Sequence, residues 1–341
     1  MSWFFRLTGF EEAGYHETRD RLAVGDGRLH SHVNGRAFGI GTLELVSLGE
    51  LRQRVEALSE TPRLQVGFVQ ADARRLHRQR ENAGALFQVA SQFNLLEMVG
   101  YDVTPEHGVA GYEHDPTQGP ACAIAAGAAT IFRNYFAPVG GGIGQTRDRQ
   151  LDGLADLGAR LAELTGRPVG DLWEMRNGYA LCTKEGLAAI EEAVAALDDA
   201  GVDQLRGLLR IGVHGDVEVT DDPEEPGQIV TQAFCSALPV SYQRSVPTAL
   251  WSALARLVLE AAYEATLLAA MENLGRGGSP KVYLTRLGGG AFGNDDRWID
   301  EAILRALEMA RNWPLDVRIV VRDVGAAESL RSGLRERGLA S

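Results

Sequence analysis

The stretch KVYLTRLGGGAFGNDDRWIDEAILRALEM, residues 281–309, joins a short apolar run to an amphipathic helical pattern through four closely spaced glycines. In α/β proteins, a strand, a glycine-rich turn and a helix bring main-chain N–H groups to the carboxyl edge of the sheet. Glycine lacks the Cβ atom that would hold an anion away, and it accepts positive φ angles. We therefore predict that this glycine loop binds linked phosphates, although a tight turn without a ligand is the other interpretation. Its residues are Gly288, Gly289, Gly290, Ala291, Phe292, Gly293 and Asn294.

Apolar runs and helical patterns alternate along most of the chain, which predicts a fold of the α/β class. Residues 85–90, for example, are apolar enough to form a parallel strand that is buried on both faces. We expect a mixed, mostly parallel sheet sandwiched by helices. Residues 1–60 are predicted to form an N-terminal extension packed on the core. Residues 61–341 are predicted to form the α/β domain, with a large helical insertion at about 140–208.

Composition excludes several classes of function. The chain has 341 residues and a formal net charge of −12, so it lacks the surplus of basic residues that binding to nucleic acid requires. Its three cysteines are widely spread and form no zinc or disulfide pattern. We find neither a signal peptide nor a membrane span, and we therefore expect a cytoplasmic protein without a nucleic-acid or membrane partner.

Polar residues follow two of the predicted strands at the point where each strand ends. Asp72 ends the strand that begins near residue 64, and its carboxylate is suited to accept a hydrogen bond from an exocyclic amine such as adenine N6. The alternative is that Asp72 only caps the helix that follows it, which is the commoner use of aspartate at such a point. Gln92 and Asn94 follow the next strand, and their amides are fit to grip sugar hydroxyls and carbonyls.

Taken in order, the strand that ends in Asp72, the Ala-Ser-Gln-Phe-Asn cluster and the glycine loop resemble the three ligand loops of a macrodomain, the ADP-ribose-binding fold. This resemblance implies that Asp72 holds adenine, that Asn94 lies near the distal ribose and that residues 288–294 wrap the diphosphate. It also implies that ADP-ribose is the ligand or product and that no cofactor or metal is required. The similar blocks cover well under half of the chain.

The chain departs from a typical macrodomain in length and in one loop. It has Ala-Ser-Gln-Phe-Asn where macrodomains have Asn-Ala-Ala-Asn, and Gln118 and Gly119 are the candidates for the distal-ribose loop that follows. Blocks such as TQGPACA, RIGVHGDVEVT and LVLEAAYEATL are similar to a divergent macrodomain branch, found in bacterial effectors and elsewhere, that removes ADP-ribose from arginine. The resemblance therefore implies a protein partner that is ADP-ribosylated on arginine.

Cleavage of the bond between ribose and guanidinium gathers positive charge on the sugar, so carboxylates near C1″ would help. Asp216 and Glu218 are our leading catalytic pair, because residues two apart on a strand project to the same face. A solvated strand edge is the alternative interpretation. Weaker candidates flank the predicted ribose loop: Asp102, Glu106, Glu113 and Asp115.

Three functional hypotheses follow from these patterns. The first is a hydrolase, with water as nucleophile, that cleaves the N-glycosidic bond between ADP-ribose and arginine. The second is a module that binds ADP-ribose or a related nucleotide without turnover. The third is a phosphate-binding α/β enzyme that uses the same glycine loop and has no relation to ADP-ribose.

Overall fold

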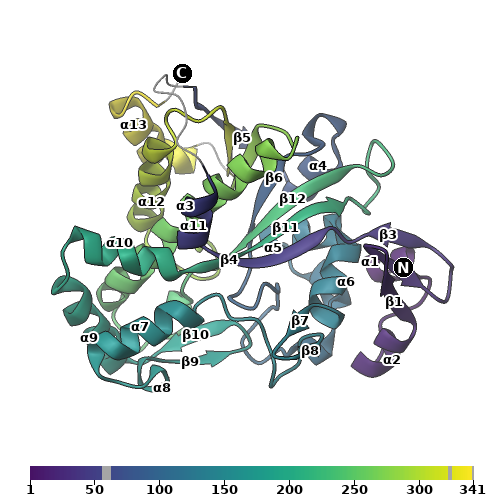
Figure 1. Ribbon diagram of the computed structural model, residues 1–341, viewed down its shortest axis with the longest axis horizontal. Coiled ribbons are helices and arrows are strands. Elements are labelled where there is room, and N and C mark those ends of the chain that lie inside the picture. Colours follow the sequence, from purple (N-terminus) through teal and green to yellow (C-terminus); the bar gives the residue numbers. More distant parts are fainter. Residues whose placement is uncertain (56–62, 322–324, 340–341) are drawn as a thin grey trace.

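The computed structural model describes residues 1–55, 63–321 and 325–339. Its centre is a seven-stranded sheet (Figure 1). From one edge to the other the strands are β4 (Thr42–Ser47), β11 (Arg210–Glu218), β12 (Ile229–Cys235), β6 (Leu86–Ala90), β13 (Lys281–Leu284), β14 (Asp316–Val321) and β5 (Gln65–Gln70). The five strands from β12 to β5 are parallel, and β11 is antiparallel to both of its neighbours. The prediction of a mixed, mostly parallel sheet is confirmed.

Successive residues of the central strands enter different cores, because side chains alternate between the two faces of a sheet. Leu86 and Val282 belong to one apolar cluster, whereas Phe87 and Tyr283 belong to another on the opposite face. Phe87 and Tyr283 also stack with their ring centroids 4.6 Å apart. The sheet is therefore buried on both faces, as the continuous apolar runs predict.

Helices cover both faces of the sheet (Figure 1). The helix α11 (Ser252–Gly275) is central to one layer, and 16 of its 24 residues are buried because other helices pack around it. Helices of this layer are α3 (Leu48–Arg54), α12 (Asp296–Met309) and α13 (Glu328–Glu336). The other layer contains α4 (Ala73–Arg78), α5 (Gln118–Ala125) and α6 (Gly127–Tyr135). In the described part of the chain, no helix is both long and apolar enough to cross a membrane.

The N-terminal segment is more regular than an extension. It forms α1 (Trp3–Thr8), α2 (Tyr15–Asp20) and a small sheet of β1 (Leu22–Gly25), β2 (Arg28–Ser31) and β3 (Ala37–Gly39). This unit packs on α6 through an apolar cluster that includes Trp3, Phe4 and Ile131. The next strand, β4, belongs to the central sheet, so the predicted extension of residues 1–60 includes part of the core. The predicted boundary near residue 60 lies outside the described residues.

The predicted insertion contains two hairpins and four helices between α6 and β11. The elements are β7 (Pro138–Val139), β8 (Gly142–Ile143), α7 (Ala155–Thr165), α8 (Val169–Leu172), β9 (Trp173–Arg176), β10 (Tyr179–Cys182), α9 (Lys184–Ala195) and α10 (Asp199–Leu208). Asn177 and Gly178 connect β9 to β10 with φ angles of 49° and 80°, the pair of positive values that a tight hairpin turn requires.

Candidate functional site

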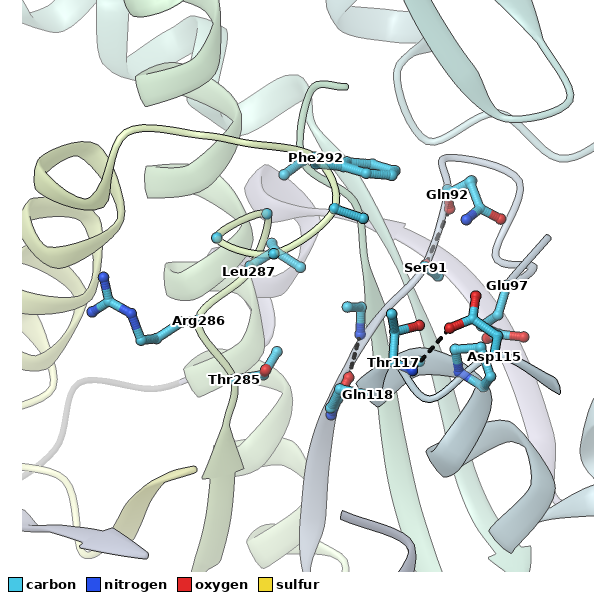
Figure 2. A pocket seen from close by; sticks show the side chains of 18 of the residues that line it. Ser91, Gln92, Glu97, Asp115, Thr117, Gln118, Thr285, Arg286, Leu287 and Phe292 are labelled. Atoms are coloured by element: carbon cyan, nitrogen blue, oxygen red, sulfur yellow. Dashed lines mark hydrogen bonds between the residues drawn. The ribbon is translucent and has the colours of Figure 1, made fainter. Parts of the chain in front are cut away.

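A cavity of about 450 Å³ lies at the carboxyl edge of the sheet, in the size range of small-molecule sites. Its walls come from the ends of β6 and β13, the glycine loop and the first turn of α5 (Figure 2). A second cavity of about 440 Å³ reaches Asp72 and shares Thr117, Gln118 and Thr285 with the first. The two cavities therefore adjoin along one cleft, at the place where open α/β sheets bind ligands.

The glycine loop has a fixed shape. Gly288 has a φ of 75°, and a Cβ atom there would lie 2.5 Å from the Cβ of Ala237. Asn294 is buried, and its Nδ2 donates to the carbonyl of Leu238 at 2.8 Å while its main-chain N–H donates to Gly288 at 3.0 Å. Asn294 and Gly293 thus anchor the loop rather than line the cavity. The predicted residues 288–292 all line it.

Several main-chain N–H groups around the cavity have no acceptor. Within the described chain, this holds for Gly288, Gly290, Ala291 and Phe292 of the loop. It also holds for Gln118 and Gly119 in the first turn of α5, where Thr117 gives no side-chain cap. Free N–H groups at a loop and at a helix start are the donors that bind anions in proteins. The cavity is therefore suited to linked phosphates.

The described residues that line this cavity include few side-chain cations. Arg286 is the only arginine or lysine among the described residues that line it. Its guanidinium is bound by Asp300 and, at 2.6 Å, by Asp296, and Figure 2 shows it directed away from the pocket. In the described part of the cavity, the groups that remain to meet a negative ligand are therefore the main-chain N–H groups.

Asp72 caps a helix and also lines a cavity. Its Oδ1 accepts from the main-chain N–H of Arg75 at 3.0 Å and so caps α4. Asp72 also lines the second cavity, beside Ala71 and Val321. The cap uses only one carboxylate oxygen in these contacts, so capping and ligand binding are compatible.

The predicted amides are mostly occupied by the protein itself. Gln118 accepts from the N–H of Ala90 at 2.9 Å and donates to the carbonyl of Gln88 at 2.8 Å, so its side chain completes the edge of β6. Gln92 holds the main chain of Met98 through both of its amide atoms. Both residues line the cavity, but their amides act as supports.

Asn94 does not reach the cavity. It is fully buried, its Nδ2 donates to Gln150 at 2.8 Å, and its Oδ1 accepts from the N–H of Leu96 at 3.1 Å. The chain turns at Leu95, whose φ is 64°, and the amide of Asn94 is directed toward Gln150 and Leu96 instead of the cavity. The predicted position of Asn94 beside the distal ribose is therefore wrong in this structure.

Gly119 is required by packing. A Cβ atom on Gly119 would lie 2.0 Å from the carbonyl oxygen of Ala90. This close approach places the start of α5 against the end of β6, where the predicted ribose loop was expected. The small residue thus explains how the free N–H groups of this turn reach the cavity.

Asp216 and Glu218 lie where the parallel strands begin, whereas the ligand cleft lies where those strands end. The prediction that the two carboxylates enter the cleft is therefore wrong. Since β11 is antiparallel to β12, its carboxyl end pairs with the start of β12 at Ile229. An irregularity between His214 and Val217, with Asp216 at a φ of 56°, also breaks the alternation assumed for the pair. Asp216 is exposed, and Glu218 accepts from the N–H of Gly39 at 2.6 Å.

Among the weaker carboxylate candidates, Asp115 is the one that lines the cavity. It is partly exposed, and its Oδ1 accepts from the N–H of Thr117 at 2.8 Å (Figure 2). Asp102 pairs instead with Arg176, and Glu106 accepts from the N–H of Arg147. The turn formed by Asp115 orients its carboxylate at the start of α5.

Glu97 is a carboxylate that the sequence analysis missed. Its side chain lies fully buried beneath the cavity, 3.3 Å from Nη2 of Arg133, whose side chain is equally buried. Burial raises the pKa of Glu97 to about 7, and the nearby Arg133 lowers it by less. One feature of the sequence could have indicated Glu97: it is an ionisable residue within the apolar segment that follows β6, at the carboxyl edge of the sheet.

Two tyrosines of the site were also missed. Tyr179 and Tyr242 line the cavity together with Phe292, and they come from the predicted insertion and from the segment after β12. Burial is the largest cause that raises the pKa of Tyr179. The adjacent Tyr242 and then Asp115 raise it further by smaller amounts. No local pattern marks these tyrosines, because only the packing of the insertion brings them to the cavity.

Comparisons with known proteins give structural matches only. A scan against protein-family models yields no match. A search of curated proteins also finds no similar sequence. The structure aligns with a poly(ADP-ribose) glycohydrolase from Thermomonospora curvata at 16% identity over 95% of this chain and 96% of that chain, with a TM-score of 0.44. It aligns with a Deinococcus radiodurans poly(ADP-ribose) glycohydrolase in complex with ADP-ribose at 14% identity over 86% and 93%, with a TM-score of 0.40.

Proposed function

We propose that this protein is a hydrolase that removes ADP-ribose from arginine side chains of modified proteins, acting in the cytoplasm. The observation that carries this proposal is the cavity at the carboxyl edge of the sheet, where unpaired N–H groups of two segments meet next to a carboxylate. An acidic protein can bind a nucleotide diphosphate in this way without side-chain cations. The macrodomain resemblance of the same segments supports the choice of ADP-ribose.

The cleft suggests a direction for the ligand. Asp72 lines the second cavity and not the first, and its free carboxylate oxygen would accept from adenine N6. The N–H groups of Gly290 and Gly119 would hold the diphosphate in the first cavity. The distal ribose then faces Asp115, on the side of the pocket that Figure 2 shows across from Leu287.

Asp115 replaces Asp216 and Glu218 as the proposed catalytic carboxylate. The C1″–N bond breaks with its electron pair going to the guanidine, and positive charge develops on the ribose. A water molecule adds to C1″ and gives a proton to Asp115, which returns it to the departing guanidine. Water and the carboxylate balance this reaction, so the proposal requires no metal or other cofactor.

A binding module without turnover is the second candidate. It is favoured by the burial of Glu97, which leaves Asp115 as the one partly exposed carboxylate among the described residues that line the cavity. A glycoside hydrolase usually has two carboxylates at the scissile bond. Turnover therefore has to be measured separately from binding.

The test combines calorimetry with a release assay. We expect ADP-ribose to bind the wild-type protein and the protein to release ADP-ribose from an arginine-modified peptide. Asp115→Asn should retain binding and lower the release rate by about 100-fold or more, the usual contribution of a positioned acid or base. Binding without release from arginine, serine or acidic conjugates would favour the binding module. Absence of ADP-ribose binding would overturn both candidates.

A further inference from the structure

Three aromatic rings form one wall of the cavity beside Asp115. Tyr179 and Phe292 have ring centroids 5.4 Å apart, Tyr242 and Phe292 5.7 Å, and Tyr179 and Tyr242 5.5 Å. They come from β10, from the segment after β12 and from the glycine loop. All three line the cavity, so the wall is part of the ligand site and not only of the core.

The hairpin of β9 and β10 fixes this wall in place. Tyr179 Oη donates to the carbonyl of Met98 at 2.7 Å, and the carbonyl of Gly178 accepts from Phe93 at 2.9 Å. Asn177 Nδ2 donates to the carbonyl of Tyr101 at 2.6 Å. A side chain at Gly178 would meet Asn94 at 2.6 Å, so the turn is pressed against the loop after β6. The aromatic wall is therefore preformed and needs little ordering when a ligand binds.

The charge at this end of the cavity is negative. Asp115 is near enough to Tyr179 to affect the titration of its phenol, and burial keeps that phenol protonated because it raises the pKa of Tyr179. Arg286, the single basic side chain among the described lining residues, is held by Asp296 and Asp300. Among the described lining residues, a cation that enters here therefore meets a carboxylate and aromatic faces, and the one arginine is already paired.

We propose that Asp115, Tyr179 and Tyr242 form a leaving-group subsite that accepts a planar cation and rejects a neutral group of the same shape. This inference rests on the proposed function and adds the origin of its preference for arginine. A guanidinium lies favourably over an aromatic face, and its N–H groups donate in their plane to a carboxylate. A neutral leaving group, such as that of a serine or acidic conjugate, gains neither attraction.

The test uses two small probes that have almost the same shape. The protein is first saturated with ADP-ribose in a calorimeter, and methylguanidinium or neutral methylurea is then titrated while binding is followed by ligand-observed NMR. We expect methylguanidinium to bind and methylurea not to bind. Tyr242→Leu, likewise saturated with ADP-ribose before the titration, should bind methylguanidinium about 5- to 30-fold more weakly, the effect of losing about 1–2 kcal/mol of cation–π attraction.

Phe38→Leu provides the matched control. Phe38 lies on β3, where Arg36 covers its ring at 4.7 Å, and it does not line the cavity. Its replacement should leave both probes unchanged. Equal binding of the two probes, no binding of methylguanidinium, or equal losses in Tyr242→Leu and Phe38→Leu would each overturn the subsite. Failure of ADP-ribose to bind in the first step would instead overturn the proposed function, and the subsite with it.

Discussion

At the scale of single residues, the buried pair of Glu97 and Arg133 makes the free energy of unfolding depend on pH. Both side chains are fully buried, and burial of a charge in a pair often costs more than the pair returns. Burial accordingly raises the pKa of Glu97 and lowers that of Arg133, each against the attraction of its partner. The folded protein therefore holds the Glu97 proton more tightly than the unfolded chain does.

The first prediction follows from this difference. Between the ordinary pKa of 4.5 and the folded value of about 7, the folded state binds more protons at Glu97, so the free energy of unfolding falls as pH rises. Below this window the contribution of Glu97 is fully present. Urea unfolding of Glu97→Gln at pH 5 and pH 7.5 should show a smaller decline than the wild type. Identical declines in the two proteins would contradict the prediction.

Asp72 allows its structural and recognition roles to be separated by one substitution. Serine caps helices about as well as aspartate, so Asp72→Ser should change the free energy of unfolding by less than about 0.5 kcal/mol. It removes the carboxylate proposed to accept from adenine N6, a charged hydrogen bond of about 1.5–3 kcal/mol. Calorimetry should show at least about tenfold weaker ADP-ribose binding. The hypoxanthine analogue, which lacks that amine, should bind the variant and the wild type with the same affinity. Weaker binding of the analogue to the variant than to the wild type would exclude this role.

At the scale of elements, the glycine loop could be predicted from the sequence, whereas the positions of Asp216 and Glu218 could not. The apolar run before Gly288 and the helical pattern after it define a strand, a loop and a helix by local spacing alone. The prediction for Asp216 and Glu218 fails because residue spacing does not give the direction in which a strand runs through the sheet. It therefore cannot tell whether the end of the strand lies beside the ligand cleft. The antiparallel direction of β11 depends on its pairing with β4 and β12, and local sequence does not encode that pairing.

Long-range packing also explains the residues that were missed. Tyr179 reaches the cavity only because the hairpin of the insertion docks on the loop after β6, through Asn177 and Gly178. Glu97 is distinguished by burial beside Arg133, which lies on α6. Asp115, by contrast, could be shortlisted from the sequence because it precedes the helix start that carries Gln118 and Gly119.

The loop gives a prediction at this scale. A Cβ atom at Gly290 would meet nothing within 4 Å, and the residue lines the cavity with a free N–H. Gly290→Val should therefore fold normally but place a branched side chain where phosphate oxygens would approach. We expect ADP-ribose affinity to fall at least about tenfold, a loss of about 1.4 kcal/mol. Gly25→Val, at an equally open position on β1, is the control and should bind like the wild type. Unchanged binding in Gly290→Val would exclude the loop as the phosphate site.

At the scale of the whole molecule, a network of ion pairs joins the insertion to the α/β core. Glu264 on α11 is almost fully buried and binds Arg52 of α3 and Arg305 of α12, each at 2.6 Å. Arg52 continues to Asp203 of α10 at 2.7 Å. One carboxylate thus helps to connect four helices from different parts of the chain. One of them, α10, belongs to the insertion, and the same insertion carries Tyr179 on β10.

The last prediction concerns this network. Glu264→Gln leaves Arg52 and Arg305 without their buried counter-charge, and breaking a buried pair costs about 3–5 kcal/mol. Since both arginines are about a third exposed, we expect a smaller loss of about 2 kcal/mol in the free energy of unfolding, measured in urea. Glu163→Gln, which breaks an exposed pair with Arg160 on α7, should cost less than about 0.5 kcal/mol. Equal losses in the two variants would mean that the network does not secure the insertion on the core, and the preformed aromatic wall would then need another support.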